Sequence, residues 1–205
     1  MAGRDYWLSI AQSDDPDDLR EHILTGFKDG KPFTPYVPTI PLPAPIGQVL
    51  DFGCGVGRTF PFLKTIARDV TGFDLPPMIA RCRVLAPEPA DELLDDWNST
   101  CVRRFDLIVC VLVLQHIEPA ACRAYLEDFA RMAPAVYLLS RADSDFGTNV
   151  FDEAAATGMF DAGECVEVDH DPETHQLRVL GRTSFHAARA ADARGHYEVL
   201  LRSRI

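Results

Sequence analysis

Residues 49–57 read VLDFGCGVG, an apolar run followed by glycine at every second position: Gly53, Gly55 and Gly57. A strand that bends tightly into a helix needs glycine here, because side chains would obstruct the bend and keep a ligand off the backbone. The stretch therefore predicts a strand-to-helix turn that holds a ligand against bare backbone.

A second apolar run, residues 70–73, ends in Asp74, where a parallel strand would present a carboxylate to a ribose. The two features together predict a cofactor that contains adenosine. A dinucleotide turn has the spacing GxGxxG, whereas this chain has GxGxG followed by Arg58. Asp51 would add negative charge beside a pyrophosphate, but it suits a cofactor that carries an ammonium or sulfonium group.

A third stretch, FDLIVCVLVL at residues 105–114, fits a strand covered on both faces, followed by a helix that begins at Pro119. With this stretch the chain resembles the class I S-adenosylmethionine-dependent methyltransferases. Their first motif is similar to residues 51–57 and their second acidic position to Asp74. Many small-molecule members carry a phrase similar to Leu114-Gln115-His116-Ile117 after the fourth strand. The resemblance covers residues 46–141 well and the rest poorly.

The resemblance implies S-adenosyl-L-methionine as the cofactor. In the family an acidic residue after the third strand meets the adenine amino group, so Asp95 or Asp96 would serve here, with Trp97 as a stacking wall; alternatively, they lie at an exposed helix end. The predicted cofactor-binding residues are Asp51, Phe52, Gly53, Cys54, Gly55, Gly57, Arg58, Asp74, Leu75, Met78, Asp95, Asp96, Trp97, Val111, Leu112 and His116.

Two of these residues leave alternatives open. His116 follows the carboxyl end of a strand, where open α/β sheets bind ligands, so it is the candidate general base. Alternatively, its ring packs under the cofactor and bonds a backbone carbonyl. Arg58 opposes the helix dipole, so it needs a carboxylate partner, such as that of the cofactor, or points into solvent.

Three motifs that would indicate other classes of acceptor are absent. The sequence has no Asn/Asp-Pro-Pro-aromatic phrase after the fourth strand, as used for transfer to base or amide nitrogens, no oxygen-rich metal cluster of the catechol type, and no lysine-rich tetrad of the ribose-methylating type. Their absence favours metal-independent transfer to a small molecule, or to a protein side chain. Candidate substrate contacts are four aromatic residues, which ordinary core packing explains slightly better, and one arginine, which solvation also explains: Tyr6, Trp7, Phe33, Tyr36 and Arg141. Asp143, Asp145 and Asn149 are further candidates in the same loop as Arg141.

Composition indicates an ordinary enzyme. The 205 residues include 31 acidic and 20 basic ones, a net charge of -11, which argues against nucleic acid or an anionic membrane as partner. Six cysteines form no CxxC pair, so neither a zinc site nor a redox motif is predicted. No signal peptide or long apolar run is seen, so we expect a cytoplasmic protein; the oligomeric state stays open.

We expect one domain over residues 1–205: a helical lid (1–31), a proline-rich connector (32–45), a cofactor-binding core (46–141) and a C-terminal part (142–205). Strands and helices alternate in the core, which predicts a doubly wound, Rossmann-like α/β fold with three αβα layers. Its sheet should have seven mostly parallel strands and an antiparallel last strand. The predicted strands are 48–52, 70–73, 105–113, 135–140, 165–169, 176–180 and 196–202, and the predicted helices are 5–29, 57–67, 76–84, 119–132 and 150–158.

The third strand of the family has no clear counterpart in residues 85–104, which are polar and contain proline. Two other functions compete with methyl transfer. One is a catalytically silent protein that binds the same cofactor and regulates or scaffolds a partner. The other is a nicotinamide-dependent oxidoreductase with an atypical turn.

Overall fold

The computed structural model describes residues 4–13, 36–142, 148–170, 176–190 and 193–205. The predicted substrate contacts Phe33, Asp143 and Asp145 lie outside these residues, as does most of the helical pattern predicted for 5–29. In the described part of the chain, no helix is both long enough and apolar enough to cross a membrane.

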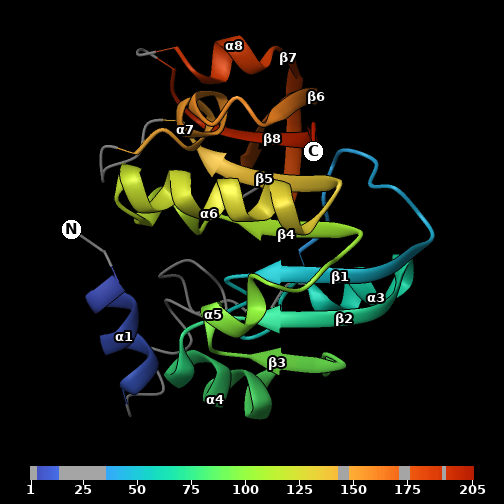
Figure 1. Ribbon diagram of the computed structural model, residues 1–205, viewed down its shortest axis with the longest axis vertical. Coiled ribbons are helices and arrows are strands. Elements are labelled where there is room, and N and C mark those ends of the chain that lie inside the picture. The colour runs from blue at the N-terminus through green and yellow to red at the C-terminus, as the bar shows by residue number, and fades with distance from the viewer. Residues whose placement is uncertain (1–3, 14–35, 143–147, 171–175, 191–192) are drawn as a thin grey trace.

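The centre of the fold is one eight-stranded sheet with the order β3-β2-β1-β4-β5-β8-β6-β7 (Figure 1). The first five strands in this order pair in parallel, and β8 runs antiparallel to both β5 and β6. The strands are β1 (Ile46–Phe52), β2 (Ala67–Phe73), β3 (Glu92–Leu94), β4 (Leu107–Val111), β5 (Ala135–Arg141), β6 (Phe160–His170), β7 (Leu177–Thr183) and β8 (His196–Ser203).

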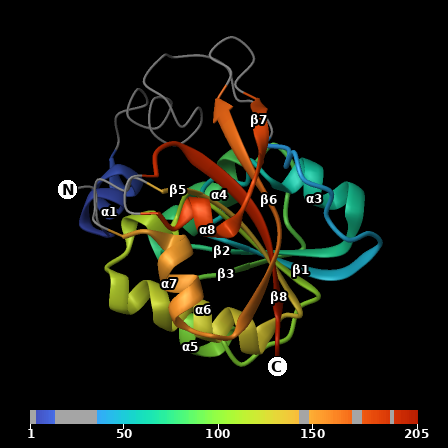
Figure 2. The same cartoon turned by 90° about the horizontal axis from the view of Figure 1, so that it is seen from above.

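Helices cover both faces of the sheet, which gives the three predicted layers (Figure 2). One face packs against α5, α6 and α7, and the other against α3, α4 and the connector residues around Tyr36 and Ile40. The helices are α1 (Arg4–Gln12), α3 (Phe60–Ile66), α4 (Pro76–Leu85), α5 (Trp97–Thr100), the 3-10 helix η2 (Leu114–His116), α6 (Pro119–Met132), α7 (Val150–Ala156) and α8 (Phe185–Ala188).

The predicted fold class is confirmed, but the predicted number of seven strands is wrong by one. The strand that the sequence did not reveal is β3, which has three residues, lies at the sheet edge and is only partly buried. A partly exposed edge strand needs no continuous apolar run, so its sequence carries little signal.

Several element ends differ from the prediction; for example, the strand predicted at 165–169 is β6, which begins at Phe160. Three of the differences have a clear local reason. The helix predicted from residue 57 begins at Phe60, because Gly57 has a φ of 81° and the turn continues to Thr59. The strand predicted to reach residue 113 ends at Val111, since Leu112 has a φ of 58°. The helix predicted to reach residue 158 ends at Ala156, just before Gly158 with its φ of 66°.

Candidate functional site

The glycine turn joins β1 to α3, and glycine is needed at its three positions for different physical reasons. All three have positive φ, where residues with a side chain are strained. A Cβ on Gly53 would lie 2.3 Å from Val113 Cγ2, and one on Gly57 would lie 2.5 Å from Phe60 Cδ2. A Cβ on Gly55 would meet nothing within 4 Å. Packing therefore requires the outer two glycines, while Gly55 leaves a backbone cradle open to a ligand.

Asp74 at the end of β2 borders this cradle. Its Oδ2 accepts from the N–H of Gly55 at 2.8 Å, and its Oδ1 accepts from the N–H of Leu75 at 2.7 Å. Loss of hydration raises the pKa of Asp74 to about 6, although both N–H groups act to lower it. The predicted ribose-binding carboxylate thus lies beside the glycine turn and is held in place by backbone groups.

Asp51 is the second carboxyl group of the site and is only 2% exposed. The hydroxyl of Thr59, just before α3, donates to Asp51 Oδ2. Burial raises the pKa of Asp51 to about 7; Thr59 opposes this rise, and the charge of Asp74 adds to it. Two carboxyl groups that lose hydration next to each other favour a cationic ligand, because a positive charge stabilises their ionised forms.

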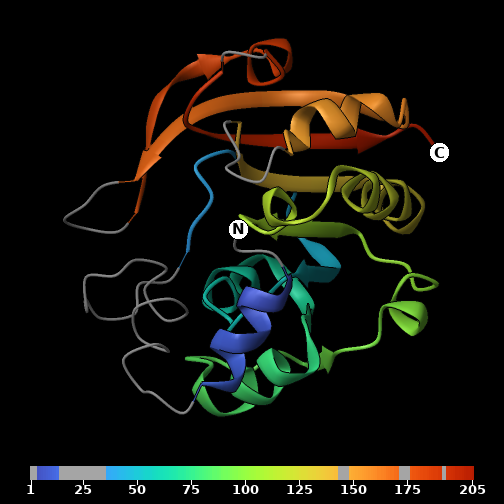
Figure 3. The same ribbon diagram turned by 90° about the vertical axis from the view of Figure 1, so that its left-hand side faces the viewer.

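The helix α1 packs against α4 (Figure 3). Ile10 and Ala11 of α1 form an apolar cluster with Val56 of the glycine turn and Met78 of α4. The guanidinium of Arg81 on α4 donates to carbonyl oxygens at the end of α1, at 3.1 Å to Ala11 O and 2.6 Å to Ser13 O. Because cations stabilise helix C-termini, this contact holds α1 beside Val56 and Met78, next to the predicted cofactor-binding turn. The sequence did not single out Arg81.

The predicted adenine contacts lie after β3. Asp95 is exposed, and Asp96 caps α5 by accepting from the N–H groups of Asn98 and Ser99. Trp97 is partly buried, and its Nε1 donates to Asp128 Oδ2 at 3.0 Å. Its ring also packs edge-on against an aromatic cluster that includes the rings of Phe52, Phe73 and Tyr125. The adenine roles of Asp95, Asp96 and Trp97 remain predictions.

The end of β4 carries the next group of predicted residues. The N–H of Leu112 donates to Leu139 O at 2.8 Å, and the chain then forms η2, which contains His116. The ring of His116 makes an edge contact with Trp7 of α1, with 5.5 Å between ring centroids and 68° between planes. The structure therefore brings the candidate base and a candidate substrate contact together from distant parts of the chain. Tyr6 in turn contacts Trp7, at 5.3 Å between centroids.

Tyr36 lies in a buried polar network on the α3 and α4 face of the sheet. Its hydroxyl lies 2.5 Å from that of Tyr137 and donates to Glu198 Oε1 at 3.2 Å. Glu198 is 0% exposed and also accepts from the hydroxyl of Tyr137 and from the N–H of Thr39. This arrangement matches the packing alternative for Tyr36. A glutamate inside the apolar run YEVLL of the last strand was the available signal for this network.

Arg58 lies next to Tyr36, and its carbonyl oxygen accepts from the N–H of Tyr36 at 3.0 Å. Loss of hydration lowers the pKa of the Arg58 guanidinium, and the neighbouring Tyr36 side chain opposes this shift. The residue therefore lies between the glycine turn and the connector. A contact of Arg58 with the cofactor's carboxylate stays a prediction.

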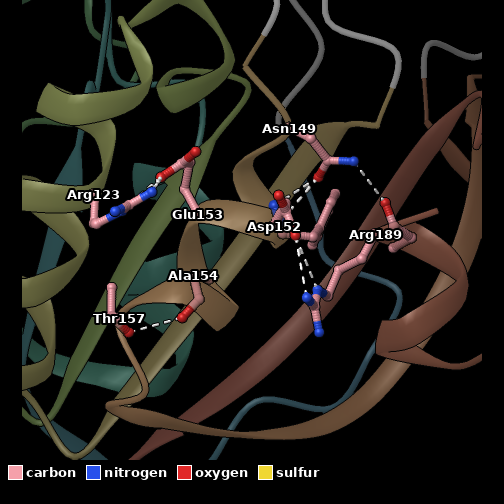
Figure 4. A network of polar contacts seen from close by, with 9 residues as sticks. Arg123, Asn149, Asp152, Glu153, Ala154, Thr157 and Arg189 are labelled. Carbon is pink, nitrogen blue, oxygen red and sulfur yellow. Dashed lines mark hydrogen bonds and ion pairs between the residues drawn. The ribbon is translucent and has the colours of Figure 1, made fainter. Parts of the chain in front are cut away.

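Asn149, one of the candidate loop residues, caps α7 (Figure 4). Its Oδ1 accepts from the N–H groups of Phe151 and Asp152, and its Nδ2 donates to Ala188 O at 3.0 Å. Both ends of the side-chain amide thus bond the backbone of α7 and α8. Arg141 lies at the end of β5, where its N–H donates to Gln115 Oε1 at 2.8 Å.

Comparison with known proteins agrees with this geometry. A family model described as a methyltransferase domain matches residues 18–198, well beyond the 46–141 covered by the motifs. The comparison with curated proteins finds no match to the sequence.

Solved structures share the fold at low sequence identity. The TehB-like S-adenosylmethionine-dependent methyltransferase from Corynebacterium glutamicum is 18% identical, with 80% of this chain and 83% of that chain covered and a TM-score of 0.55. Magnesium protoporphyrin IX methyltransferase from Synechocystis is 18% identical, with coverage of 80% and 71% and a TM-score of 0.52. The N-methyltransferase NodS from Bradyrhizobium japonicum is 16% identical, with coverage of 100% and 94% and a TM-score of 0.53.

The match to the family model over most of the chain, together with the glycine turn and its two carboxyl groups, places the protein in the methyltransferase domain family, as its motifs predicted.

Proposed function

We propose that the protein transfers a methyl group from S-adenosyl-L-methionine to a small-molecule oxygen or nitrogen acceptor without a metal ion. The observation that carries this proposal is the open backbone cradle at Gly55, which is bonded to the Asp74 carboxyl group, together with the nearby Asp51 carboxyl group, whose pKa the charge of Asp74 raises. Such a cradle fits a cofactor that needs close backbone approach at one end and carboxylates near its positive charges.

The cofactor supplies a methyl group already activated on a sulfonium, so the protein's task is to orient the reactants and exclude water. The turn and Asp74 bind one part of the cofactor, and α1 packs on Val56 and Met78 beside it. Two of the neighbouring structures were solved with this cofactor or with S-adenosylhomocysteine bound, which supports the cofactor predicted from the sequence.

The acceptor is proposed as a small molecule on two grounds. The net charge of -11 is unsuited to binding a nucleic acid, whose phosphates require clustered lysine and arginine. The aromatic side chains of Tyr6 and Trp7 meet edge to face, and Trp7 makes the same kind of contact with His116, so the pair offers a wall for a small acceptor. The neighbour from Synechocystis is named for a porphyrin substrate, which agrees with a small-molecule acceptor, and the neighbour from Bradyrhizobium is named an N-methyltransferase, which agrees with a nitrogen acceptor.

Two measurements test the proposal. Calorimetry with S-adenosylmethionine, S-adenosylhomocysteine and NAD should detect binding of the first two only; binding of NAD alone would overturn it. Incubating the protein with fractionated metabolites and methyl-labelled cofactor should then yield a labelled small molecule, and the Asp74→Ala variant should yield much less of it when the cofactor is limiting. If the cofactor binds but the label enters no metabolite, the silent binding protein is the better description.

A further inference from the structure

The buried side chain of Gln115 connects η2 to the end of β5. Only 6% of the residue is exposed. Its Oε1 accepts from the backbone N–H of Arg141 at 2.8 Å and from the hydroxyl of Ser140 at 3.3 Å. Its Nε2 lies 3.3 Å from Nε2 of the neighbouring His116.

These contacts determine which way the amide points. A backbone N–H can only donate, so the group that faces Arg141 N must be the oxygen of the Gln115 amide. The NH₂ group therefore faces His116, and an NH₂ group can only donate. The ring atom that receives this bond, Nε2 of His116, must then carry a lone pair, which leaves the proton of a neutral ring on Nδ1.

We propose that Gln115 is a positioning residue that holds His116 as the neutral ring with its proton on Nδ1. In this state the one ring lone pair is at Nε2 and is occupied by the Gln115 amide. A proton accepted at Nε2 would face the NH₂ group and would force the amide away from Arg141 and Ser140. His116 therefore does not act as the base. Its ring instead packs against Trp7 on α1.

The consequence for methyl transfer rests on the proposed function, whereas the protonation of the ring does not. The ring is therefore tested by nuclear magnetic resonance on the full chain without any acceptor. Histidine-selective ¹⁵N labelling and a two-bond ¹H–¹⁵N correlation at pH 8 give one ring pattern for each of the six histidines. The His116→Gln variant identifies the pattern of residue 116 by its loss. We expect a protonated, pyrrole-type Nδ1 and an unprotonated, pyridine-type Nε2.

Gln115→Glu is the decisive variant, because it keeps the size of the side chain and an oxygen toward Arg141 N. Its second oxygen would face His116 and can only accept, so the ring should switch to a protonated Nε2. Gln115→Leu, which removes both polar contacts, should release the ring to the Nε2–H form that is common in water. A wild-type His116 with the proton on Nε2, or a ring pattern unchanged in Gln115→Glu, would overturn the proposal.

Binding of S-adenosylhomocysteine serves as the independent control. Variants that keep the wild-type circular dichroism spectrum and bind this ligand are folded at the site, so their ring patterns can be compared directly. If no form of the protein binds the ligand, the proposed function fails while the assignment of the ring still stands on its own spectrum.

Discussion

Asp74 Oδ2 accepts a hydrogen bond from the backbone N–H of Gly55 at 2.8 Å, so the carboxylate at the end of β2 is bonded to the centre of the glycine turn. The bond joins two predicted cofactor-binding positions that are 19 residues apart in the sequence. A change at Asp74 should therefore affect both the predicted ligand contact and the shape of the cradle.

Asp74→Ala should weaken S-adenosylmethionine binding by about 10- to 100-fold, because a hydrogen bond to a charged group contributes about 1.5–3 kcal/mol. Isothermal titration calorimetry measures the change. Asp69→Ala is the matched control, since Asp69 lies on the same strand but pairs with the exposed Arg68. Equal affinity of the Asp74 variant and the wild type would contradict the assigned contact.

Asp51 should make the ligand-free protein less stable as pH rises. Its pKa of about 7 lies above the ordinary value near 4, so between these pH values the native state holds a proton that the unfolded state releases. The contribution of Asp51 to stability is therefore present at low pH and is lost as pH rises through 7. Urea unfolding at pH 5 and pH 8 measures how much free energy of unfolding is lost between these pH values. The loss should be smaller for Asp51→Asn than for the wild type. Identical losses in both proteins would exclude Asp51 as the cause.

Gly55→Ala should abolish tight cofactor binding while the protein still folds. The position has a φ of 55° and open space, so alanine costs about 1–2 kcal/mol of backbone strain and its methyl group fills the cradle. Gly158→Ala is the matched control, because Gly158 has a φ of 66° and equally open space after α7. Both variants should lose similar amounts of thermal stability, but Gly158→Ala should bind the cofactor normally. Normal binding by Gly55→Ala would show that the cradle is not used.

Glu198→Ala should destabilise the fold by about 3–5 kcal/mol, because it leaves the buried hydroxyls of Tyr36 and Tyr137 without their shared acceptor. Tyr36→Phe removes one donor and keeps the carboxylate bonded, so its cost should be only about 1 kcal/mol. Chemical denaturation of both variants gives the free energies of unfolding. A loss below 1 kcal/mol for Glu198→Ala would mean that the network does not hold the connector on the sheet.

The sequence predicted those elements whose signals are local. The helix at 119–132 begins at a proline, carries an apolar stripe and has the predicted bounds in the structure. The strand β4 follows from an apolar run, and the turn at 53–57 follows from its three glycines. In each case the residues of one segment are enough to predict its structure, because backbone sterics and burial on both faces act within that segment.

Other features depend on segments that meet only in the folded chain. The strand β3 forms because its three residues pair with the edge of β2, and no pattern in Glu92–Leu94 predicts that pairing. The contact between Trp7 and His116 and the bonds of Arg81 to the end of α1 likewise need the packing of α1. Residue types alone named Trp7 and His116 as candidates but did not pair them, and they did not name Arg81.

The sequence by itself determined the methyltransferase fold, the glycine turn and the two carboxyl groups, because each rests on local backbone geometry or on strand order. Only the tertiary structure decided that Tyr36 belongs to a buried network with Glu198 and that Gln115 faces both Arg141 and His116. The physical reason is that hydrogen bonds are directional and short, so their partners are set by the packing of strands and helices that are distant in the chain.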